Sequence, residues 1–429
     1  MTRRTCATTL ILTTWFLPVA AQRDRIDAEV ERALPRVTEM RRQIHENPEL
    51  GNREVETAAL AADHLHALGF DDVRTGVAHT GVVAVLRGGR PGPVVAVRAD
   101  MDALPVTEET DLPFRSTKRA TYLGQDVGVM HACGHDIHTA VQLGVASIFK
   151  SLQPQLPGTV VFLFQPAEEG PPPGEAGGAA LMLEEGVFDD PRPEAVFGLH
   201  ASAHVDVGKI VYTPGGALAA VDHFRATIQG LQAHGAAPHL SIDPVVMAAQ
   251  AVTALQTIRS RSLSPLAPSV VTVGMIRGGT RFNIIPGEVL LEGTVRTYDP
   301  DVQDTVERRM GEILDGITRA GGGSFALDYD RVTPVTINDP ALTDRSIPSL
   351  VAAVGGDNLA LAEPWMAGED FSLFANEVPG FFFMLGTLAP GTTSGGHHSP
   401  TFRADDAALP VGMRAMAFLL WDYLSQSMD

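Results

Sequence analysis

The spacing of apolar side chains predicts an α/β chain that opens with two helices. Apolar residues recur every three or four positions over residues 26–44 and again over 55–68, a period that places them on one face of an amphipathic helix. Compact apolar runs without polar alternation follow, and such runs are typical of strands buried on both faces of a largely parallel sheet. They cover residues 82–86, 94–97, 159–164 and 195–199, and a helix is expected at 140–152.

The middle of the chain predicts an inserted domain. Its pattern gives the order βαββαβ, a split motif that commonly folds as a small open-faced sandwich. The expected elements span residues 223–231, 243–259, 270–276, 289–298, 302–320 and 325–332. We therefore expect residues 212–329 to form an α+β, ferredoxin-like unit. Residues 22–211 and 330–429 should form one α/β domain, a mostly parallel mixed sheet with helices on both faces.

Length and charge narrow the class of protein. A chain of 429 residues exceeds the size at which single hydrophobic cores stop growing, and 45% hydrophobic residues supply material for two cores. The net charge of −19 makes the surface repel phosphate backbones. Nucleic acid is therefore not an expected partner.

The first 21 residues have the pattern of a secretory signal peptide. Arg3 and Arg4 precede an apolar stretch over residues 10–20, and small residues follow before Gln22. The apolar run is shorter than the roughly 20 residues that span a bilayer, so we expect cleavage and no stable membrane anchor afterwards. The expected location is the periplasm or the medium. Cys133 would then be the only thiol, because Cys6 leaves with the signal.

Polar side chains gather where the predicted strands end. In an open α/β sheet, ligands bind beyond the carboxyl ends of the strands, and the residues found there are imidazole, thiolate and carboxylate, the ligand set of zinc and its first-row neighbours. A lone histidine there would more often be structural, but several such groups together indicate a metal site. They are Asp100, Asp102, Glu168, Glu169 and His200, the cluster His131, Cys133, His135, Asp136 and His138 before the expected helix, and His397 with His398.

Ten segments resemble a known family. The sequence is similar to metallo-amidohydrolases that include hippurate hydrolases, indole-acetyl amino acid hydrolases and aminoacylase-like enzymes, related to carboxypeptidase G. The similar segments are HENPEL at 45, RADMDALP at 98, MHACGHDIHTA at 130, QPAEEG at 165, FGLH at 197, AHGAAPH at 233, FNIIP at 282, GTVRT at 293, GEDF at 368 and HHSP at 397.

The resemblance implies a dinuclear site. By position, it implies that two divalent ions are bound, zinc first, with manganese, cobalt and nickel also compatible. The implied ligands are Cys133, His135, Glu169, His200 and His398. Glu168, beside a ligand, looks like the general acid/base.

The resemblance also gives roles to the inserted domain, which it implies is a lid and dimerisation domain. His234 resembles a lid histidine that reaches a neighbouring subunit's active site, where it stabilises the developing oxyanion. Asn283 and Arg296 look like lid groups that grip the substrate's carboxylate. A homodimer or higher homo-oligomer is expected.

Some roles stay open. Asp100 and Asp102 stand where the carboxypeptidase branch has His-x-Asp, so a role behind the ligands is expected for Asp100. His397 is an alternative to His398. Glu369 and Asp370 either close the outer shell of the metals or cap a helix at the cleft.

The expected function is hydrolysis of the amide bond of a small N-acyl amino acid, hippurate-like or related, releasing a carboxylic acid and an amino acid. A metallo-dipeptidase or carboxypeptidase is the nearest alternative. An inactive exported binding protein on the same fold is a third reading, and a cysteine hydrolase built on Cys133 is a fourth. The acyl group, amino acid and stereochemistry stay open.

Overall fold

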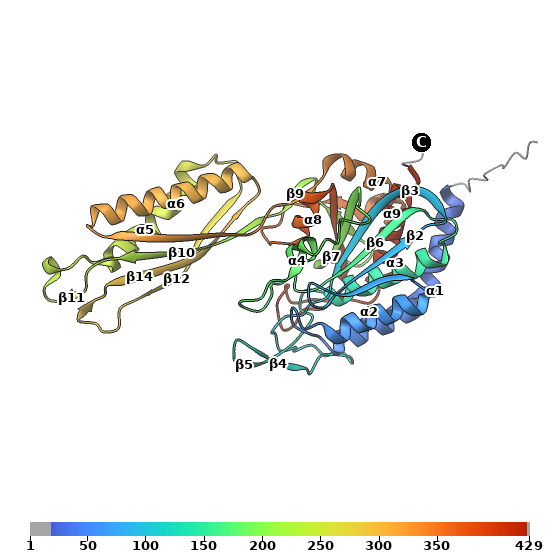
Figure 1. Ribbon diagram of the computed structural model, residues 1–429, viewed down its shortest axis with the longest axis horizontal. Coiled ribbons are helices and arrows are strands. Elements are labelled where there is room, and N and C mark those ends of the chain that lie inside the picture. The colour runs from blue at the N-terminus through green and yellow to red at the C-terminus, as the bar shows by residue number, and fades with distance from the viewer. Residues whose placement is uncertain (1–18, 427–429) are drawn as a thin grey trace, which may run out of the picture.

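The computed structural model describes residues 19–426. Most of the expected signal peptide, residues 1–18, lies outside this range. A larger unit holds an eight-stranded sheet, and a smaller elongated unit extends from it (Figure 1). Within residues 19–426, no helix combines the length and apolar character needed to cross a bilayer.

The sheet of the larger unit is parallel at its centre, and antiparallel pairs flank this centre on both sides. Its strand order is β1-β2-β6-β3-β7-β18-β8-β17, and the four adjacent strands β6, β3, β7 and β18 run parallel. The expected mostly parallel, mixed sheet is therefore confirmed. The bounds are β1 Asp72–Val77, β2 Gly81–Arg87, β3 Arg90–Asp100, β6 Pro157–Gln165, β7 Ala195–Asp206, β8 Ile210–Tyr212, β17 Leu359–Leu361 and β18 Gly380–Leu388.

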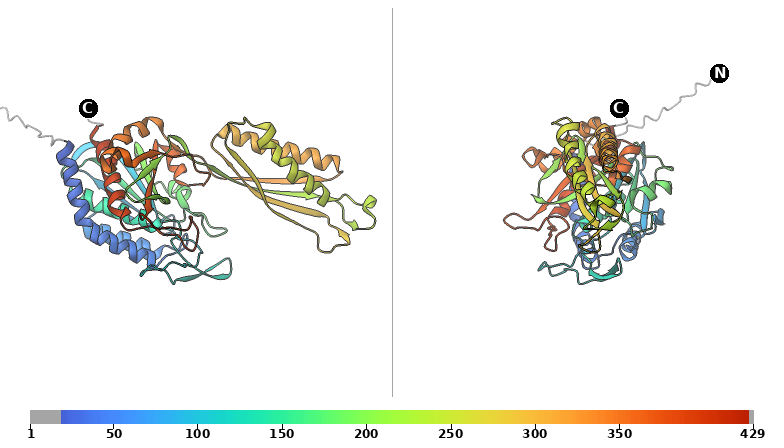
Figure 2. Two further views of the ribbon diagram at one scale, coloured as in Figure 1. Left: turned by 180° about the vertical axis from the view of Figure 1, so that it is seen from behind. Right: turned by 90° about the vertical axis from the view of Figure 1, so that its left-hand side faces the viewer.

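Helices cover both faces of this sheet because successive strand side chains point to opposite sides. In β6, Phe162 packs into one core, whereas Val161 and Leu163 pack into the other. The first core is closed by α1 Val19–Glu46, α2 Val55–Leu68, α3 His135–Ser151, α7 Pro340–Val354 and α9 Ala408–Gln426, and the second by α4 Gly178–Glu184 and α8 Phe371–Glu377. The left-hand view of Figure 2 shows helices on the outside of the strands of this unit.

The smaller unit has the expected βαββαβ order. Its sheet, β12-β14-β10-β15, is antiparallel, and two helices pack on it around their own core. Asp243 and Asp299 cap these helices, each followed by a proline, so the two Asp-Pro pairs set where the helices begin. The bounds are β10 Ala220–Gln229, α5 Pro244–Thr257, β12 Ser269–Gly278, β14 Glu288–Thr297, α6 Pro300–Ala320 and β15 Ser324–Thr333.

The borders of this unit differ from residues 212 and 329. Residue 212 ends β8 in the large sheet, and β9 Gly215–Leu218 pairs with β16 Thr336–Asn338. The smaller sheet therefore begins at Ala220, and β15 continues to Thr333. The remaining short strands are the hairpin β4 Arg119–Tyr122 with β5 Gln125–Gly128, and the pair β11 Ala233–His234 with β13 Ile284–Ile285.

Candidate active site

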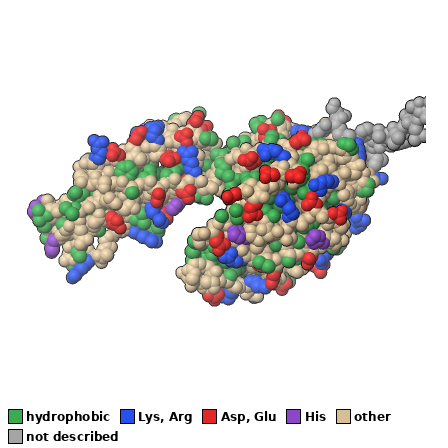
Figure 3. Space-filling model, in the orientation of Figure 1, with side chains coloured by type: hydrophobic (Ala, Val, Ile, Leu, Met, Phe, Trp, Pro, Cys, Tyr) green, Lys and Arg blue, Asp and Glu red, His purple; other side chains and the backbone are tan. Residues whose placement is uncertain are grey.

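A cavity of about 430 Å³ lies between the larger unit and the near end of the smaller one, where the surface is hollowed (Figure 3). Cys133 enters it from the loop before α3, Glu168 and Glu169 from the segment after β6, and His200 from β7. His397 and His398 come from the loop between β18 and α9, and Arg296 comes from β14 of the smaller unit. The metal-binding candidates of four segments thus meet at one edge of the sheet.

Two local details differ from the sequence prediction. Helix α3 begins at His135 rather than at residue 140. Its first turn buries His135, Asp136 and His138, so a search for apolar periodicity misses that turn. His200 lies inside β7 and not at its end; β3 pairs with β7 only as far as Gly198, so the next stretch of β7 is free to face the cavity.

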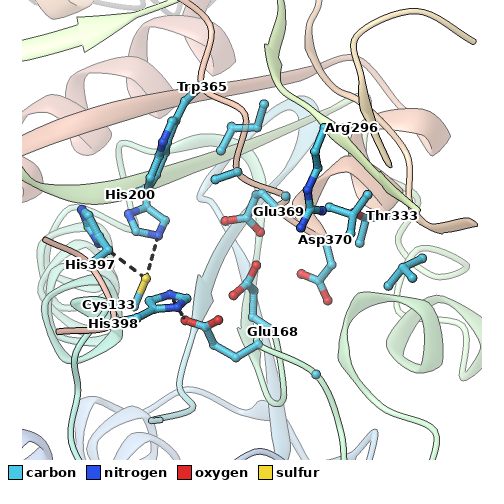
Figure 4. Close-up of a pocket in the computed structure, with 17 residues that line it drawn as sticks. Cys133, Glu168, His200, Arg296, Thr333, Trp365, Glu369, Asp370, His397 and His398 are labelled. Atoms are coloured by element: carbon cyan, nitrogen blue, oxygen red, sulfur yellow. Dashed lines mark hydrogen bonds and ion pairs between the residues drawn. The ribbon is translucent and has the colours of Figure 1, made fainter. Parts of the chain in front are cut away.

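The predicted ligands approach one another closely (Figure 4). Cys133 Sγ lies 3.5 Å from His200 Nε2 and 3.6 Å from His397 Nδ1. His398 Nε2 lies 3.0 Å from Glu169 Oε1, and His135 Nε2 lies 4.0 Å from that same oxygen. The donor atoms form three overlapping groups, and within each group they lie within 4.8 Å of one another. The groups are Cys133 with His200 and His397, Cys133 with Glu169 and His398, and His135 with Glu168 and Glu169.

The imidazoles are oriented as metal ligands are. His135 Nδ1 lies 3.1 Å from Asp102 Oδ1, which fixes the proton on Nδ1 and leaves the Nε2 lone pair for the cavity. That Nε2 is buried without a hydrogen-bond partner among the described residues. His200 Nδ1 donates to the Ala201 carbonyl over 2.7 Å, so its Nε2 faces Cys133. Thiol, imidazoles and carboxylate therefore fit first-row divalent cations.

His398 is held by its backbone. Its φ of 65° lies in the left-handed region that non-glycine residues rarely adopt, and its N–H donates to the Ala132 carbonyl over 2.8 Å. That bond ties the Gly-rich loop to the segment carrying Cys133. Both His397 and His398 lie beside Cys133, so the geometry keeps both as candidates.

Asp100 has a structural role. Its Oδ1 accepts from His138 Nδ1 over 2.6 Å and its Oδ2 accepts from Arg98 over 2.6 Å. The other nitrogen of His138 accepts the Ala201 N–H over 2.7 Å. Because this aspartate and this histidine are already engaged by protein groups, they hold the ligand segments in place and do not offer a further metal site.

Arg98 is a functional residue that sequence reasoning missed. It is fully buried, and its guanidinium donates to Glu369 over 2.9 Å and to Asp370 over 2.8 Å. A charged residue directly after the apolar run of residues 94–97, still within β3, was the available signal, because buried charges are almost always paired. Glu369 also accepts from the Phe371 N–H and Asp370 from the Ala179 N–H, at the starts of α8 and α4.

Glu168 sits among these carboxylates. It forms a group with Glu369 and Asp370 whose oxygens lie within 4.8 Å of one another. Burial and the charges of Glu369 and Glu169 raise the pKa of Glu168 well above its usual range. A carboxylate with raised proton affinity beside a cavity has the property that a general base needs.

The protonation of the Cys133 thiol depends on whether a cation is bound beside it. Burial and the neighbouring Glu169 and Glu168 raise its pKa, so with protein charges alone the thiol keeps its proton. A divalent cation deprotonates a coordinating thiol outright. Metal ligation, and not free nucleophilic chemistry, is therefore the role that these surroundings support.

Arg296 supplies the positive end of the cavity. Its side chain lines the cavity near Thr333 (Figure 4), and its Nη1 is buried without a hydrogen-bond partner among the described residues. Burial lowers the pKa of this guanidinium. An unpaired cation in an otherwise acidic cavity is a site for an anionic group of a ligand.

His234 and Asn283 do not line the cavity of their own chain. His234 is exposed in β11 and pairs with Ile284 of β13, and the Asn283 carbonyl accepts the Gly235 N–H over 2.9 Å. In Figure 1, β11 lies at the end of the smaller unit that is far from the eight-stranded sheet. The structure therefore brings together the predicted ligands, Glu168 and Arg296, but not these two residues.

Comparison with known proteins agrees with this geometry. The sequence model of peptidase family M20/M25/M40 matches residues 96–422, which include the candidate ligands and Glu168. The protein belongs to this family. The suspected relationship to metallo-amidohydrolases is thereby confirmed, and the protein is a metal-dependent amidohydrolase.

Individual relatives cover nearly the whole chain. N-acetylcysteine deacetylase of Bacillus subtilis is 38% identical over 384 residues, 90% of this chain and 96% of its own. IAA-amino acid hydrolase ILR1-like 2 of Arabidopsis thaliana is 37% identical over 394 residues, 91% of this chain and 85% of its own. A crystal structure from Bacillus subtilis, described as a dinuclear metal-binding peptidase of the M20 family, matches with a TM-score of 0.78 and 35% identity over 92% of this chain and 99% of its own.

Proposed function

We propose that the protein hydrolyses the amide bond of small N-acyl amino acids, releasing a carboxylic acid and an amino acid. The observation that carries this proposal is one cavity with three components: clustered metal donors, the carboxylate of Glu168 and the unpaired guanidinium of Arg296. A substrate with a free carboxylate could bind Arg296 while its amide reaches the donor cluster. Relatives named as a deacetylase and an amino acid conjugate hydrolase support this substrate class.

We assign two divalent ions to Cys133, His135, Glu169, His200 and His398, with zinc first and manganese, cobalt or nickel as alternatives. When bound, such ions lower the pKa of a water from 15.7 towards about 7 and polarise a carbonyl oxygen. The relative described as dinuclear supports the stoichiometry.

Glu168 then performs the proton transfers. Its carboxylate accepts the proton of the attacking water, because it faces the same cavity as the candidate metal donors and lies within 4.8 Å of the His135 and Glu169 donor atoms. The same carboxyl group donates that proton to the amide nitrogen as the C–N bond breaks. Arg98 anchors Glu369 and Asp370 beside it, so the base keeps its position through the cycle.

We further propose a homodimer in which His234 and Asn283 of one subunit reach the cavity of the other. The tip of the smaller unit, residues 230–242 with 277–287, contains Arg277, Arg281, His234 and His239 but no Asp or Glu. The cavity is lined by Glu168, Glu169, Glu369 and Asp370. Opposite charges favour this approach, and the open edge strand β12 favours pairing between copies.

Export is proposed on the N-terminal pattern alone. Separation of periplasm and medium from cytoplasm, followed by N-terminal sequencing, tests it. Mature protein outside the cytoplasm that begins near Gln22 is the expected result, and full-length protein in the cytoplasm would refute it.

A substrate panel on the metal-reconstituted protein tests the function. The panel holds hippurate, N-acetyl amino acids, indole-acetyl amino acids and dipeptides. We expect amino acid release from the N-acyl compounds, loss of activity with a chelator and recovery with metal. A metallopeptidase is the second candidate, since the family also holds a peptidase; preference for the dipeptides would favour it. Activity that survives metal removal would refute both.

A further inference from the structure

The cavity has two chemically different sides. Arg296 and Thr333 lie on one side, and Trp365 lies on the other, above His200 and His397 (Figure 4). If Arg296 holds the carboxylate of the amino acid, as proposed above, the acyl group on the far side of the amide points towards Trp365. No charged group is needed there, because an acyl group carries none.

Trp365 is held by its backbone while its ring stays accessible. Its N–H donates to the Ala217 carbonyl over 2.9 Å, and its carbonyl accepts the Ala219 N–H over 3.3 Å. These bonds fix the segment against the short bridge at Leu218. The residue is nevertheless 41% exposed, although burial of an indole is strongly favourable. An anchored backbone with an uncovered ring is a surface ready to receive an apolar group.

A second, smaller cavity also borders Trp365. It measures about 40 Å³ and shares Leu218 and Trp365 with the main cavity. A cavity that accepts benzene measures on the order of 150 Å³, so this second cavity is too small for an aryl ring. Of the two cavities, only the main one can therefore hold an aryl group against Trp365.

His397 borders the same space. Its ring centroid lies 5.5 Å from that of Trp365, with the planes tilted by 52°, which is within the range of favourable aromatic pairs. The two rings form a corner at the acyl side of the candidate metal donors. A planar ring could stack on the indole while its carbonyl carbon stays near those donors.

We propose that Trp365 determines acyl specificity by forming the wall of the acyl subsite, which favours aryl and similarly large apolar acyl groups over acetyl. This inference rests on the proposed function, which assigns the carboxylate to Arg296. It assigns the residue to substrate binding and gives it no part in proton transfer.

Kinetics on two substrates with the same amino acid test the proposal. Hippurate and N-acetylglycine differ only in the acyl group, so the Arg296 side stays constant. In Trp365→Ala, the ratio of kcat/KM for hippurate to that for N-acetylglycine should fall about ten-fold, the size expected for loss of one aromatic contact with its buried area. Trp365→Phe, which keeps an aromatic face, should retain most of the ratio.

Leu361→Ala is the matched control. Leu361 is an exposed apolar residue on the same segment that lines neither cavity, and its loss should leave the ratio unchanged. A ratio in Trp365→Ala that equals or exceeds the wild-type ratio would overturn the assignment. If wild-type protein cleaves neither substrate, the proposed function fails instead.

Fluorescence gives a readout that does not depend on turnover. The chain has three tryptophans, Trp15, Trp365 and Trp421, and Trp421 is buried against Phe149. Titration of the metal-reconstituted protein with phenylacetate should change the emission saturably, titration with acetate should not, and Trp365→Phe should lose the response. Equal responses to the two acids, or a response that survives in Trp365→Phe, would contradict the proposal.

Discussion

The cavity of the larger unit and the tip of the smaller unit present their candidate residues in opposite ways. In the cavity, His135 and His200 are buried, and each has one ring nitrogen fixed by a neighbouring oxygen. At the tip, His234 is exposed on a strand of two residues, and its Nδ1 accepts the nearby Ala236 N–H over 3.0 Å. The candidate metal donors thus meet within one chain, whereas the proposed role of the tip residues requires a second chain.

This difference separates two kinds of functional residue. Preorganised groups are held by their own fold before substrate arrives, so their loss affects chemistry or folding directly. Groups contributed across an interface depend on association and can be supplied by another copy. Variants in the two regions distinguish these two kinds of residue.

Loss of the proposed base should have the largest effect. Glu168→Gln keeps the size of the side chain but removes proton acceptance, so kcat should fall by about 10³- to 10⁴-fold, towards the upper range for acid–base catalysis. Metal content should remain that of the wild type. The exposed Glu377→Gln, away from the cavity, should keep full turnover. Near wild-type kcat in Glu168→Gln with metal bound would refute the role.

Local patterns predicted part of this picture, because apolar spacing indicated the βαββαβ order and strand ends placed imidazole, thiol and carboxylate side chains at one edge of the sheet. The ligand set and the role of Glu168 were implied only by the resemblance to the family, and they stay predictions. The network around Arg98 was not predictable, because Glu369 and Asp370 meet it only after the sheet has formed. Nor did the sequence assign a role to His131, whose two ring nitrogens are buried without hydrogen-bond partners among the described residues. The proposed role of His234 in a partner's cavity was implied only by the resemblance, because a contact between two chains leaves no local pattern.

Arg98→Leu should cause the next largest effect, on folding. The substitution leaves Asp100, Glu369 and Asp370 buried without their cation, and such a loss typically costs about 3–5 kcal/mol. Denaturant unfolding measures this cost. Arg87→Leu, which removes the exposed pair with Asp72, should cost at most about 1 kcal/mol. Similar losses in both variants would contradict the structural role of Arg98.

His234→Ala should lower kcat by about 10²-fold, the lower range for loss of one oxyanion donor. A mixture of the His234→Ala and Glu168→Gln proteins that is unfolded and then refolded together tests whether His234 acts across subunits. A mixed dimer has one cavity with Glu168 intact and a partner that carries His234, so two impaired proteins should regain activity together. Each variant refolded alone is the control. No recovery in mixtures that contain mixed dimers would place His234 outside the partner's cavity.

The smallest expected effect concerns pH. His45 Nδ1 lies 2.7 Å from Asp136 Oδ2, and its Nε2 lies 3.2 Å from Glu108 Oε1. Burial opposes protonation of this ring, but the Asp136 charge and the hydrogen bonds raise the pKa of His45. Stability from a raised pKa is fully present below the ordinary value of about 6.5 and is lost as pH rises through the folded value. The free energy of unfolding should therefore fall with pH in this window for wild type and less for His45→Gln. If the free energy of unfolding changes with pH equally in the wild type and in His45→Gln, the raised pKa of His45 does not stabilise the fold.

The proposed function depends on two divalent ions held by five residues, Cys133, His135, Glu169, His200 and His398. Metal analysis of the purified protein, after reconstitution and removal of free metal, tests it most directly. We predict two divalent ions per chain in the wild type and fewer in His200→Ala with the fold intact by circular dichroism. Fewer than one ion per chain in the wild type, or an unchanged count in His200→Ala, would contradict the account.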